Sequence, residues 1–349
     1  MCCLNENRNT VTYETVYKYL GFSLNEHLNY ESSVEILAAS AGRALGAIVT
    51  KMIKNGGFPI NVYKKLFESC ACSVSDYAGE VWGYKQYECT RKILLRAARA
   101  YLGASKISPN VGVLSEINWL EPRSRTQVQM IRQYHRILKM DADRLTKKVY
   151  FWDRSLNSNH NVQTWNSEVR DILERSNLEF LYNSDSFCLK SVVGNLKNSL
   201  LKKDQVKWRN TAADLPKLRT FVKFKNFHTD SPHIYKALSF IQRKFTSKLR
   251  LGTLPLRVET GRYTGLAPHE RFCLMCDNAQ TETEDEIHFL LYCQAYRQRR
   301  LDFFNTLPDH FHQLDETGKL SFLLNDSDTI KMTSRFIVDC FDYRSTLIN

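Results

Sequence analysis

Four residues near the carboxyl end have the types and the spacing of a metal site. Two residues separate Cys273 from Cys276, and four residues separate His288 from Cys293. Three thiolates and one imidazole form a tetrahedral ligand set for Zn²⁺. A turn that carries a Cys pair, followed by a His/Cys pair that starts a helical segment, is a common way to close such a site. Because protein ligands fill all four positions, the sequence predicts a structural rather than a catalytic Zn²⁺.

The alternative is that these residues are ordinary buried thiols. The chain has 10 Cys, and chance pairs such as Cys70 and Cys72 occur elsewhere in it. Four potential ligands within the short stretch 273–293 are harder to obtain by chance, so the pattern favours the metal site.

Acidic residues are expected to have structural roles in this chain. Polymerases hold two divalent metals with carboxylates in a strand-turn context, and neither Asp141 with Asp143 nor Asp326 with Asp328 lies in one. Helix caps or surface positions are therefore expected for these pairs, and no catalysis is expected of this chain alone. A solvated loop and the first turn of a helix are expected for the acids between the metal ligands, namely Glu282, Glu284, Asp285 and Glu286.

The positive charge of the chain is concentrated in one segment. The formal net charge of the chain is +12. Its length of 349 residues suggests two or three domains, and its hydrophobic content of 43% supports a real core. Between Lys190 and Arg250 there are fifteen Lys and Arg residues against three acidic residues. A local field of this sign favours a polyanionic partner.

Two arrangements of cations in and after this segment suit a nucleic acid. Residues 214–229 interleave lysines with Phe221, Phe224 and Phe227, which combines charges for phosphates with rings for bases; the alternative is an amphipathic element whose Phe residues are core. Residues 249–265 place arginines on a segment broken by Gly and Pro, which suits two-point phosphate contacts. The predicted phosphate-binding residues are Lys223, Lys225, Arg243, Lys244, Arg250, Arg257, Arg262, Arg299 and Arg300.

The elements around these residues are predicted to be mainly helical. A strand or hairpin is expected within 13–29. The next element is expected to be a helix that begins with a capping box of Ser32 and Glu35 and stops at Asn55. Further helices are expected at about 87–102, 123–140, 163–182, 187–208, 231–250 and 309–343. The basic face of the 123–140 helix is expected to be solvated surface, with nucleic-acid contact as the alternative; it carries Arg123, Arg125, Arg132, Arg136 and Lys139.

The order of these motifs resembles the C-terminal part of a non-LTR (LINE-type) retrotransposon reverse transcriptase. The resemblance rests on YKYLGFSLNEHL, SDYAGEVWG and LSEINWLEP, then on LRLGTLPLRVETGRYTG followed by the Cys and His residues and DEIHFLLYCQAYRQRR. It spans about 13–305. The resemblance implies a helical thumb that cradles a template–primer duplex, with Tyr19-Leu20-Gly21 near the primer grip. It also implies a zinc knuckle that helps to bind RNA and DNA.

The sequence departs from that family in two respects. Eleven residues separate the two ligand pairs, more than in a retroviral knuckle, so a retroviral mode of RNA binding is not implied. The polymerase palm and the endonuclease have no counterpart in this sequence. An active RNA-directed DNA polymerase would require a chain that extends upstream.

These observations predict a mainly α protein with a short N-terminal β element. The expected segments are a disordered start (1–12), a thumb-like helical domain (13–154), a linker (155–162), a basic helical region with an arginine arm (163–265), a zinc knuckle (266–305) and a helical cover (306–349). The expected function is binding of RNA or DNA without catalysis. The alternatives are a helical protein-interaction module with structural zinc, or part of an active polymerase.

Localisation is expected in the nucleus or the cytoplasm. The first residues, MCCLNENRNT, lack the apolar segment of a secretory signal. The sequence shows no run that approaches the ~18 apolar residues of a membrane helix, so no membrane is expected as a partner. The pattern leaves a protein partner and the oligomeric state open.

Overall fold

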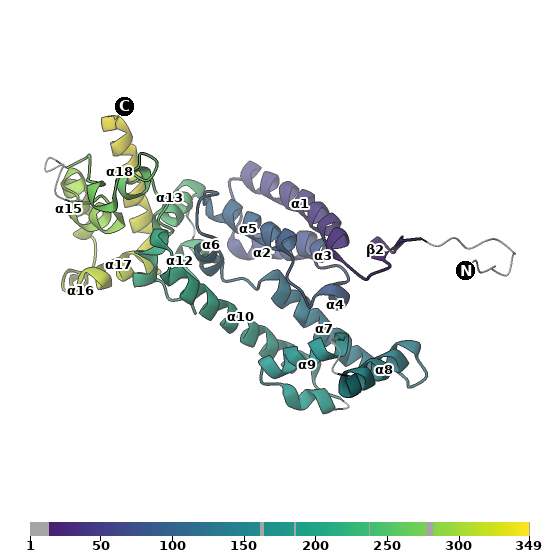
Figure 1. Ribbon diagram of the computed structural model, residues 1–349. Helices are drawn as coiled ribbons and strands as arrows, with labels where there is room; N and C mark the ends of the chain where they lie inside the picture. Colours follow the sequence, from purple (N-terminus) through teal and green to yellow (C-terminus); the bar gives the residue numbers. More distant parts are fainter. Residues whose placement is uncertain (1–13, 161–163, 185, 237, 277–281, 349) are drawn as a thin grey trace. The chain divides into compact units, whose positions relative to one another are not determined.

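The computed structural model describes residues 14–160, 164–184, 186–236, 238–276 and 282–348. Within these ranges the chain is mainly helical, with 68% helix, eighteen α-helices and one short β-hairpin near the N-terminus. Figure 1 shows the helices in chain order, from α1 in purple to α18 in yellow. The predicted fold class is confirmed. The expected disordered start, residues 1–12, lies outside the described residues.

The chain forms two compact units, and each unit is assembled from segments far apart in sequence. Unit 1 comprises Met1–Gly46, Glu68–Ile93 and Glu121–Ser199, and unit 2 comprises Ala47–Phe67, Leu94–Leu120 and Leu200–Asn349. This division differs from the sequential domains expected from composition. The linker expected at 155–162 is not an irregular segment in its first part, because residues 155–160 are the end of helix α8 (Leu145–His160). Residues 161 and 162 lie outside the described residues.

Helices α1 (Glu31–Lys54), α5 (Glu88–Leu102) and α10 (Leu189–Ala213) contribute residues to both units. The other elements of unit 1 are β1 (Val16–Tyr19), β2 (Phe22–Asn25), α3 (Ser73–Ser75), α4 (Gly79–Trp82), α7 (Pro122–Leu138), α8 and α9 (Trp165–Arg175). The other helices of unit 2 are α2 (Ile60–Leu66), α6 (Asn110–Ile117), α11 (Phe221–Phe224), α12 (Pro232–Tyr235), α13 (Phe240–Arg250), α14 (Arg257–Thr260), α15 (Arg297–Phe304), α16 (Asp309–His312), α17 (Glu316–Asn325) and α18 (Ile330–Ile348).

The N-terminal hairpin is closed by a two-residue turn. Strands β1 and β2 pair antiparallel with Tyr19 opposite Phe22. Leu20 and Gly21 both have positive φ, 46° and 87°, as a type I′ turn requires. The hairpin is anchored through Phe22, which is buried in a cluster with Tyr30, Val34, Leu37 and Trp82.

Helix α1 begins at Glu31, earlier than expected, so the predicted capping box of Ser32 and Glu35 is wrong. The Asn29 side chain instead accepts a hydrogen bond from the Glu31 N–H (3.1 Å). By length and hydropathy α1 also meets the criterion for a membrane span, which the sequence reasoning missed. Its buried positions follow one face while Glu35, Arg43 and Lys51 are exposed, and this one-sided pattern is typical of a helix that packs against protein.

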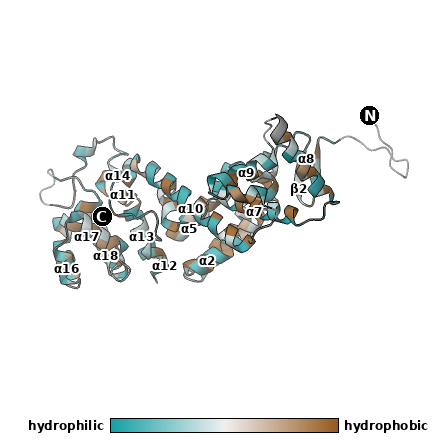
Figure 2. Ribbon diagram, turned by 90° about the horizontal axis from the view of Figure 1, so that it is seen from below, coloured by the Kyte–Doolittle hydropathy of each residue, from teal (hydrophilic) through white to brown (hydrophobic). Residues whose placement is uncertain are grey.

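In unit 1, α4 packs closely against α7. A Cβ placed on Gly83 would lie 2.4 Å from the Thr126 Cβ, so the contact requires glycine there. Arg125 of α7 forms an ion pair with Asp76 (2.7 Å) and is largely buried, contrary to the expected solvated face. Figure 2 shows hydrophobic and hydrophilic residues mixed along α7 and α9, as expected of helices that bury one side.

In unit 2, helix α18 packs against α13, α15 and α17. The core there is aromatic: the Phe289 ring lies 5.3 Å from that of Tyr296 and 5.4 Å from that of Phe341. This core holds the segment that carries the metal-ligand candidates against the C-terminal helix. Asp326 directly follows α17, and its carboxylate accepts hydrogen bonds from the N–H groups of Asp328 and Thr329 in the turn before α18 (2.9 and 2.7 Å), in line with the structural role expected for it.

Candidate metal centre and basic surface

A short two-stranded ladder positions the first pair of ligands. Phe272 and Thr283 form an antiparallel bridge. The Cys273 N–H donates to the Glu282 carbonyl, and the Glu284 N–H donates to the Arg271 carbonyl, both at 3.0 Å. The ladder therefore fixes the backbone at Cys273 directly beside the segment that leads to His288.

A π-helical turn at the start of the predicted helical segment positions the second pair. It covers His288–Tyr292, and the Cys293 N–H donates to the His288 carbonyl at 2.7 Å. The Asp285 carboxylate caps the turn by accepting from the N–H groups of Ile287 and His288 (3.0 and 2.8 Å). Since a π turn closes an i to i+5 bond, it matches the separation of the two ligands.

The four candidate ligand atoms lie within 4.8 Å of one another. The Cys293 Sγ is 3.8 Å from the Cys273 Sγ and 3.5 Å from the Cys276 Sγ, and the His288 Nε2 is 3.4 Å from the Cys276 Sγ. A tetrahedron with Zn–S bonds of about 2.3 Å has S–S edges of about 3.8 Å. The buried cluster can therefore hold a metal ion such as zinc.

The imidazole of His288 is oriented by a carboxylate. Its Nδ1 lies 2.8 Å from Glu282, which leaves Nε2 facing the thiols. Burial lowers the pKa of His288, but its contacts with Cys273 and Glu282 outweigh burial and raise that pKa overall. A hydrogen bond from Cys293 lowers the pKa of Cys273, so the cluster stabilises a thiolate. A carboxylate behind a ligating imidazole is the usual outer contact of a metal-binding histidine.

Two of the acids expected in a solvated loop are instead buried. Glu284 lies 0% exposed and binds Arg344 through both carboxylate oxygens, while it also accepts from the Arg257 N–H (2.7 Å). Glu286 is buried and accepts two hydrogen bonds from Arg219 (2.7 and 2.8 Å). The prediction was wrong because it did not foresee arginine partners from distant segments.

Arg300 lies beside the metal-ligand candidates instead of on the surface. It is buried, and its charge acts on the thiols of Cys276, Cys293 and Cys340. Burial lowers the pKa of Arg300, and the nearby Cys293 opposes that shift. A bound Zn²⁺ with three thiolates would carry a net charge of −1, which the Arg300 guanidinium would offset.

Comparisons of this chain with known proteins give no match. None of the family models matches the chain, and no curated protein or solved structure matches it either. The functional proposal therefore rests on the geometry of the residues.

Three of the predicted phosphate-binding residues are interior groups, which corrects the prediction for them. Arg250 is buried and paired with Glu116. Arg243 is buried, donates to the Tyr101 carbonyl (2.8 Å) and stacks 4.2 Å from the centre of that ring. The Lys225 ammonium donates to Ser231 and to the Thr229 carbonyl, and burial lowers its pKa to about 8. With Arg300, four of the nine residues are thus turned inward.

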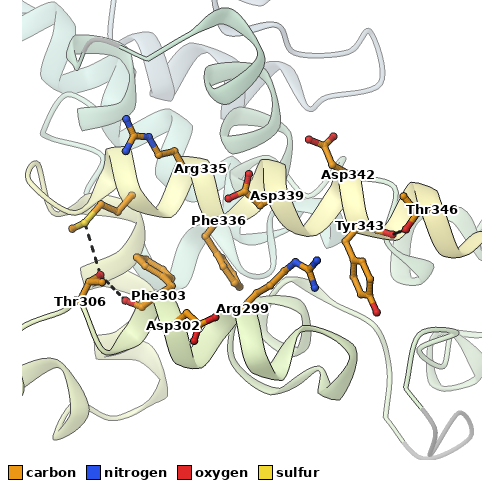
Figure 3. Close-up of a pocket in the computed structure, with 11 residues that line it drawn as sticks. Arg299, Asp302, Phe303, Thr306, Arg335, Phe336, Asp339, Asp342, Tyr343 and Thr346 are labelled. Carbon is orange, nitrogen blue, oxygen red and sulfur yellow. Dashed lines mark hydrogen bonds between the residues drawn. The ribbon is translucent and has the colours of Figure 1, made fainter.

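The other five have different degrees of access. Lys223 is exposed, whereas Lys244 and Arg257 are half-buried. Arg262 is half-buried and lies 3.4 Å from the Glu259 carboxylate. Arg299 is exposed, and its guanidinium lies 3.9 Å from the centre of the Tyr343 ring. Figure 3 shows Arg299 reaching from α15 toward Tyr343 of α18 across a groove of about 750 Å³.

The three phenylalanines of residues 214–229 belong to the core. Phe221, Phe224 and Phe227 are all buried, and the Phe221 ring meets each of the other two edge-on at 5.7 Å. The prediction that they stack on bases is wrong, and the alternative of an amphipathic element is confirmed. The surrounding cations are also engaged: Lys217 pairs with Glu259 (2.6 Å) and Arg219 with Glu286 (2.7 Å).

A basic surface that the sequence reasoning counted but did not single out lies on α10. Four cations of this helix, Lys202, Lys203, Lys207 and Arg209, are exposed, whereas Gln205 and Trp208 of the same turns are buried. We call these four residues the α10 basic face. Within the described ranges, Lys202, Lys207 and Arg209 have no carboxylate within 4 Å. The signal in the sequence is Trp208. A tryptophan in a polar helix marks the side that is buried, so the cations at the other positions are expected to face solvent.

Proposed function

We propose that this chain binds nucleic acid through its phosphates, and that its Cys273, Cys276, His288 and Cys293 cluster holds a structural Zn²⁺. The observation that carries the first part is the α10 basic face. It offers four cations within eight residues of one rigid helix, and most of them are not committed to a carboxylate. Such a face attracts a polyanion without reading its sequence.

Zinc is the metal that best suits the donor set. Three thiolates and one imidazole favour Zn²⁺ over metals that prefer oxygen ligands. The ion would supply folding free energy, about 10–16 kcal/mol in small zinc peptides at neutral pH. The ladder positions Cys273 and the π turn positions His288, and a shared ion would join these two segments. Arg300 would offset the negative charge of the loaded site.

We also propose that the chain is related to the C-terminal part of a non-LTR retrotransposon reverse transcriptase. This relation is supported by the order of its motifs: the hairpin, the helices, the arginine segment and then the zinc ligands. In that setting the α10 basic face would contact the backbone of a template, a primer or a target strand. The palm carboxylates of that family have no counterpart in this sequence, so no catalytic step is assigned to these residues.

The experiment is a salt series of binding to single-stranded RNA and DNA with the full chain. If the four cations neutralise about four phosphates, the logarithm of the affinity falls with the logarithm of the salt concentration at a slope near −3. Similar slopes for unrelated sequences are expected, because phosphate contacts do not read bases. Binding that is absent, or a slope near zero, would contradict the proposal and favour a protein-interaction module.

A further inference from the structure

Unit 1 contains a hollow that the proposed function does not use. Its volume is about 670 Å³, within the range of about 300–1,000 Å³ that small-molecule sites occupy. Three aromatic residues, Tyr30, Tyr84 and Trp165, line it together with the carboxylate residues Glu80 and Glu168. The lining thus combines aromatic rings with acidic residues.

The aromatic residues are held in place by their own contacts. The Trp165 Nε1–H donates to the Glu80 carbonyl at 2.7 Å, which fixes the indole edge. Tyr30 is buried, with its ring 5.8 Å from that of Phe22. Burial and the neighbouring Tyr84 raise the pKa of Tyr30, so these two phenols lie close together. The rings therefore do not depend on a ligand for their arrangement.

The carboxylate residues come from two different helices. Glu80 lies in α4, and Glu168 lies in the first turn of α9. Leu28 and Val81, which also line the hollow, are largely exposed. A ligand with an apolar stem and a cationic head would cover this apolar surface and lie near Glu80 and Glu168.

We propose that this hollow binds an alkylammonium group, of the kind found on a methylated lysine side chain. Ring faces attract cations by about 0.5–2 kcal/mol, and quaternary ammonium groups are bound in sites lined by several rings. The chain itself provides an example at the edge of the hollow, where the Lys85 ammonium lies 5.6 Å from the centre of the Tyr84 ring. The Lys85 ammonium would repel a ligand cation, so Lys85 is expected to lower the affinity for the ligand.

The test is calorimetric titration of the full chain with three probes. These are a short peptide containing trimethyllysine, choline, and the same peptide with an uncharged tert-butyl group in place of the trimethylammonium group. The charged peptide is expected to bind roughly 3- to 30-fold more tightly than its neutral counterpart. Choline binding as tightly as the peptide would indicate a free small cation as the ligand, since the stem would then contribute nothing.

Two surface variants with matched controls keep the test independent of folding. Glu168→Gln is expected to weaken binding of the charged peptide, and Lys85→Met to strengthen it. The controls are Glu179→Gln and Lys139→Met, which change exposed residues of the same unit that do not line the hollow. Equal binding of the charged and neutral peptides, or variants that behave like their controls, would overturn the proposal. Loss of nucleic-acid binding would not affect it.

Discussion

Arg250 and Glu116 form a two-point ion pair in the interior of unit 2. The Nε and Nη2 atoms of Arg250 each lie 2.9 Å from one oxygen of Glu116, and both side chains are fully buried. Arg250 also donates to the Leu324 carbonyl at 2.5 Å. One guanidinium thus joins helices α13, α6 and the end of α17. The sequence predicts Arg250 as a phosphate-binding residue of a loop, whereas its buried pairing with Glu116 shows that it stabilises the fold.

Removing one member of this pair is expected to destabilise unit 2. Arg250→Met leaves the Glu116 carboxylate buried without its main partner, and the loss of one partner from a buried pair costs about 3–5 kcal/mol. The exposed Arg299→Met is the control, with an expected change of about 0.5 kcal/mol or less. Denaturant unfolding followed by tryptophan fluorescence measures both. An Arg250→Met protein as stable as the control would mean that the pair is not formed.

The contribution of His233 to stability is expected to fall as the pH falls from about 6.5. Burial lowers the pKa of His233 from 6.5 to about 3. Below pH 6.5 this histidine is therefore protonated in the unfolded chain and neutral in the folded chain. The unfolded state then binds more protons, and its free energy relative to the folded state drops by at most about 1.4 kcal/mol per pH unit. His233→Gln should flatten this dependence between pH 6.5 and 4.5.

Glu116 adds a second loss at lower pH. Burial opposes its ionisation, but Arg250, His233 and Lys225 together lower its pKa to about 2. Its contribution is therefore complete above about pH 4.5 and disappears as the pH approaches 2. The exposed His27→Gln serves as the control for His233→Gln. Equal pH profiles for the two histidine variants would show that His233 is not the titrating group.

Replacing Arg300 is expected to weaken metal binding. Arg300→Met removes the buried cation beside the thiols of Cys276 and Cys293, and the loss of an outer partner typically costs 10–100-fold in metal affinity. Competition with a chelator of known zinc affinity measures the change. The adjacent exposed Arg299→Met removes the same charge and should leave the zinc affinity within about threefold. The same loss in both variants would indicate an effect of net charge alone.

The α10 basic face makes a prediction about where nucleic acid binds. Replacing Lys202, Lys207 and Arg209 by Gln should weaken binding to every single-stranded sequence and reduce the salt slope by about 2. The control removes three exposed cations that are already paired with carboxylates, Lys148, Arg170 and Arg175. Both triple variants have the same net charge, so equal binding by the two would place the interface elsewhere.

Local signals predicted the parts of the structure that depend on nearby residues. The hairpin at Gly21, the end of α1 at Asn55 and the helix ending at Gly103 follow from turn chemistry and apolar spacing. The metal ligands were also predictable, because three thiols and an imidazole at this spacing match the donor set of a tetrahedral site. Here the sequence separation and the three-dimensional arrangement agree.

The partners of the arginines were not predictable in the same way. Arg250 meets Glu116, and Arg219 meets Glu286, across 134 and 67 residues of sequence. A count of charges treats each cation as exposed, whereas burial can pair it with an acid from any other segment. The basic segment 190–250 therefore contributes less surface charge than its composition suggests, and only the fold shows which of its cations remain available.

The most direct test of the metal centre is X-ray absorption at the zinc edge of the purified full chain, with one metal per chain verified by mass. A shared Zn²⁺ predicts three sulfur atoms at about 2.3 Å and one nitrogen at about 2.0–2.1 Å. Replacing Cys276 by Ser should remove one sulfur from that shell or abolish metal binding. A first shell made mainly of oxygen atoms, or a chain that retains no metal, would contradict the central claim that Cys273, Cys276, His288 and Cys293 share one ion.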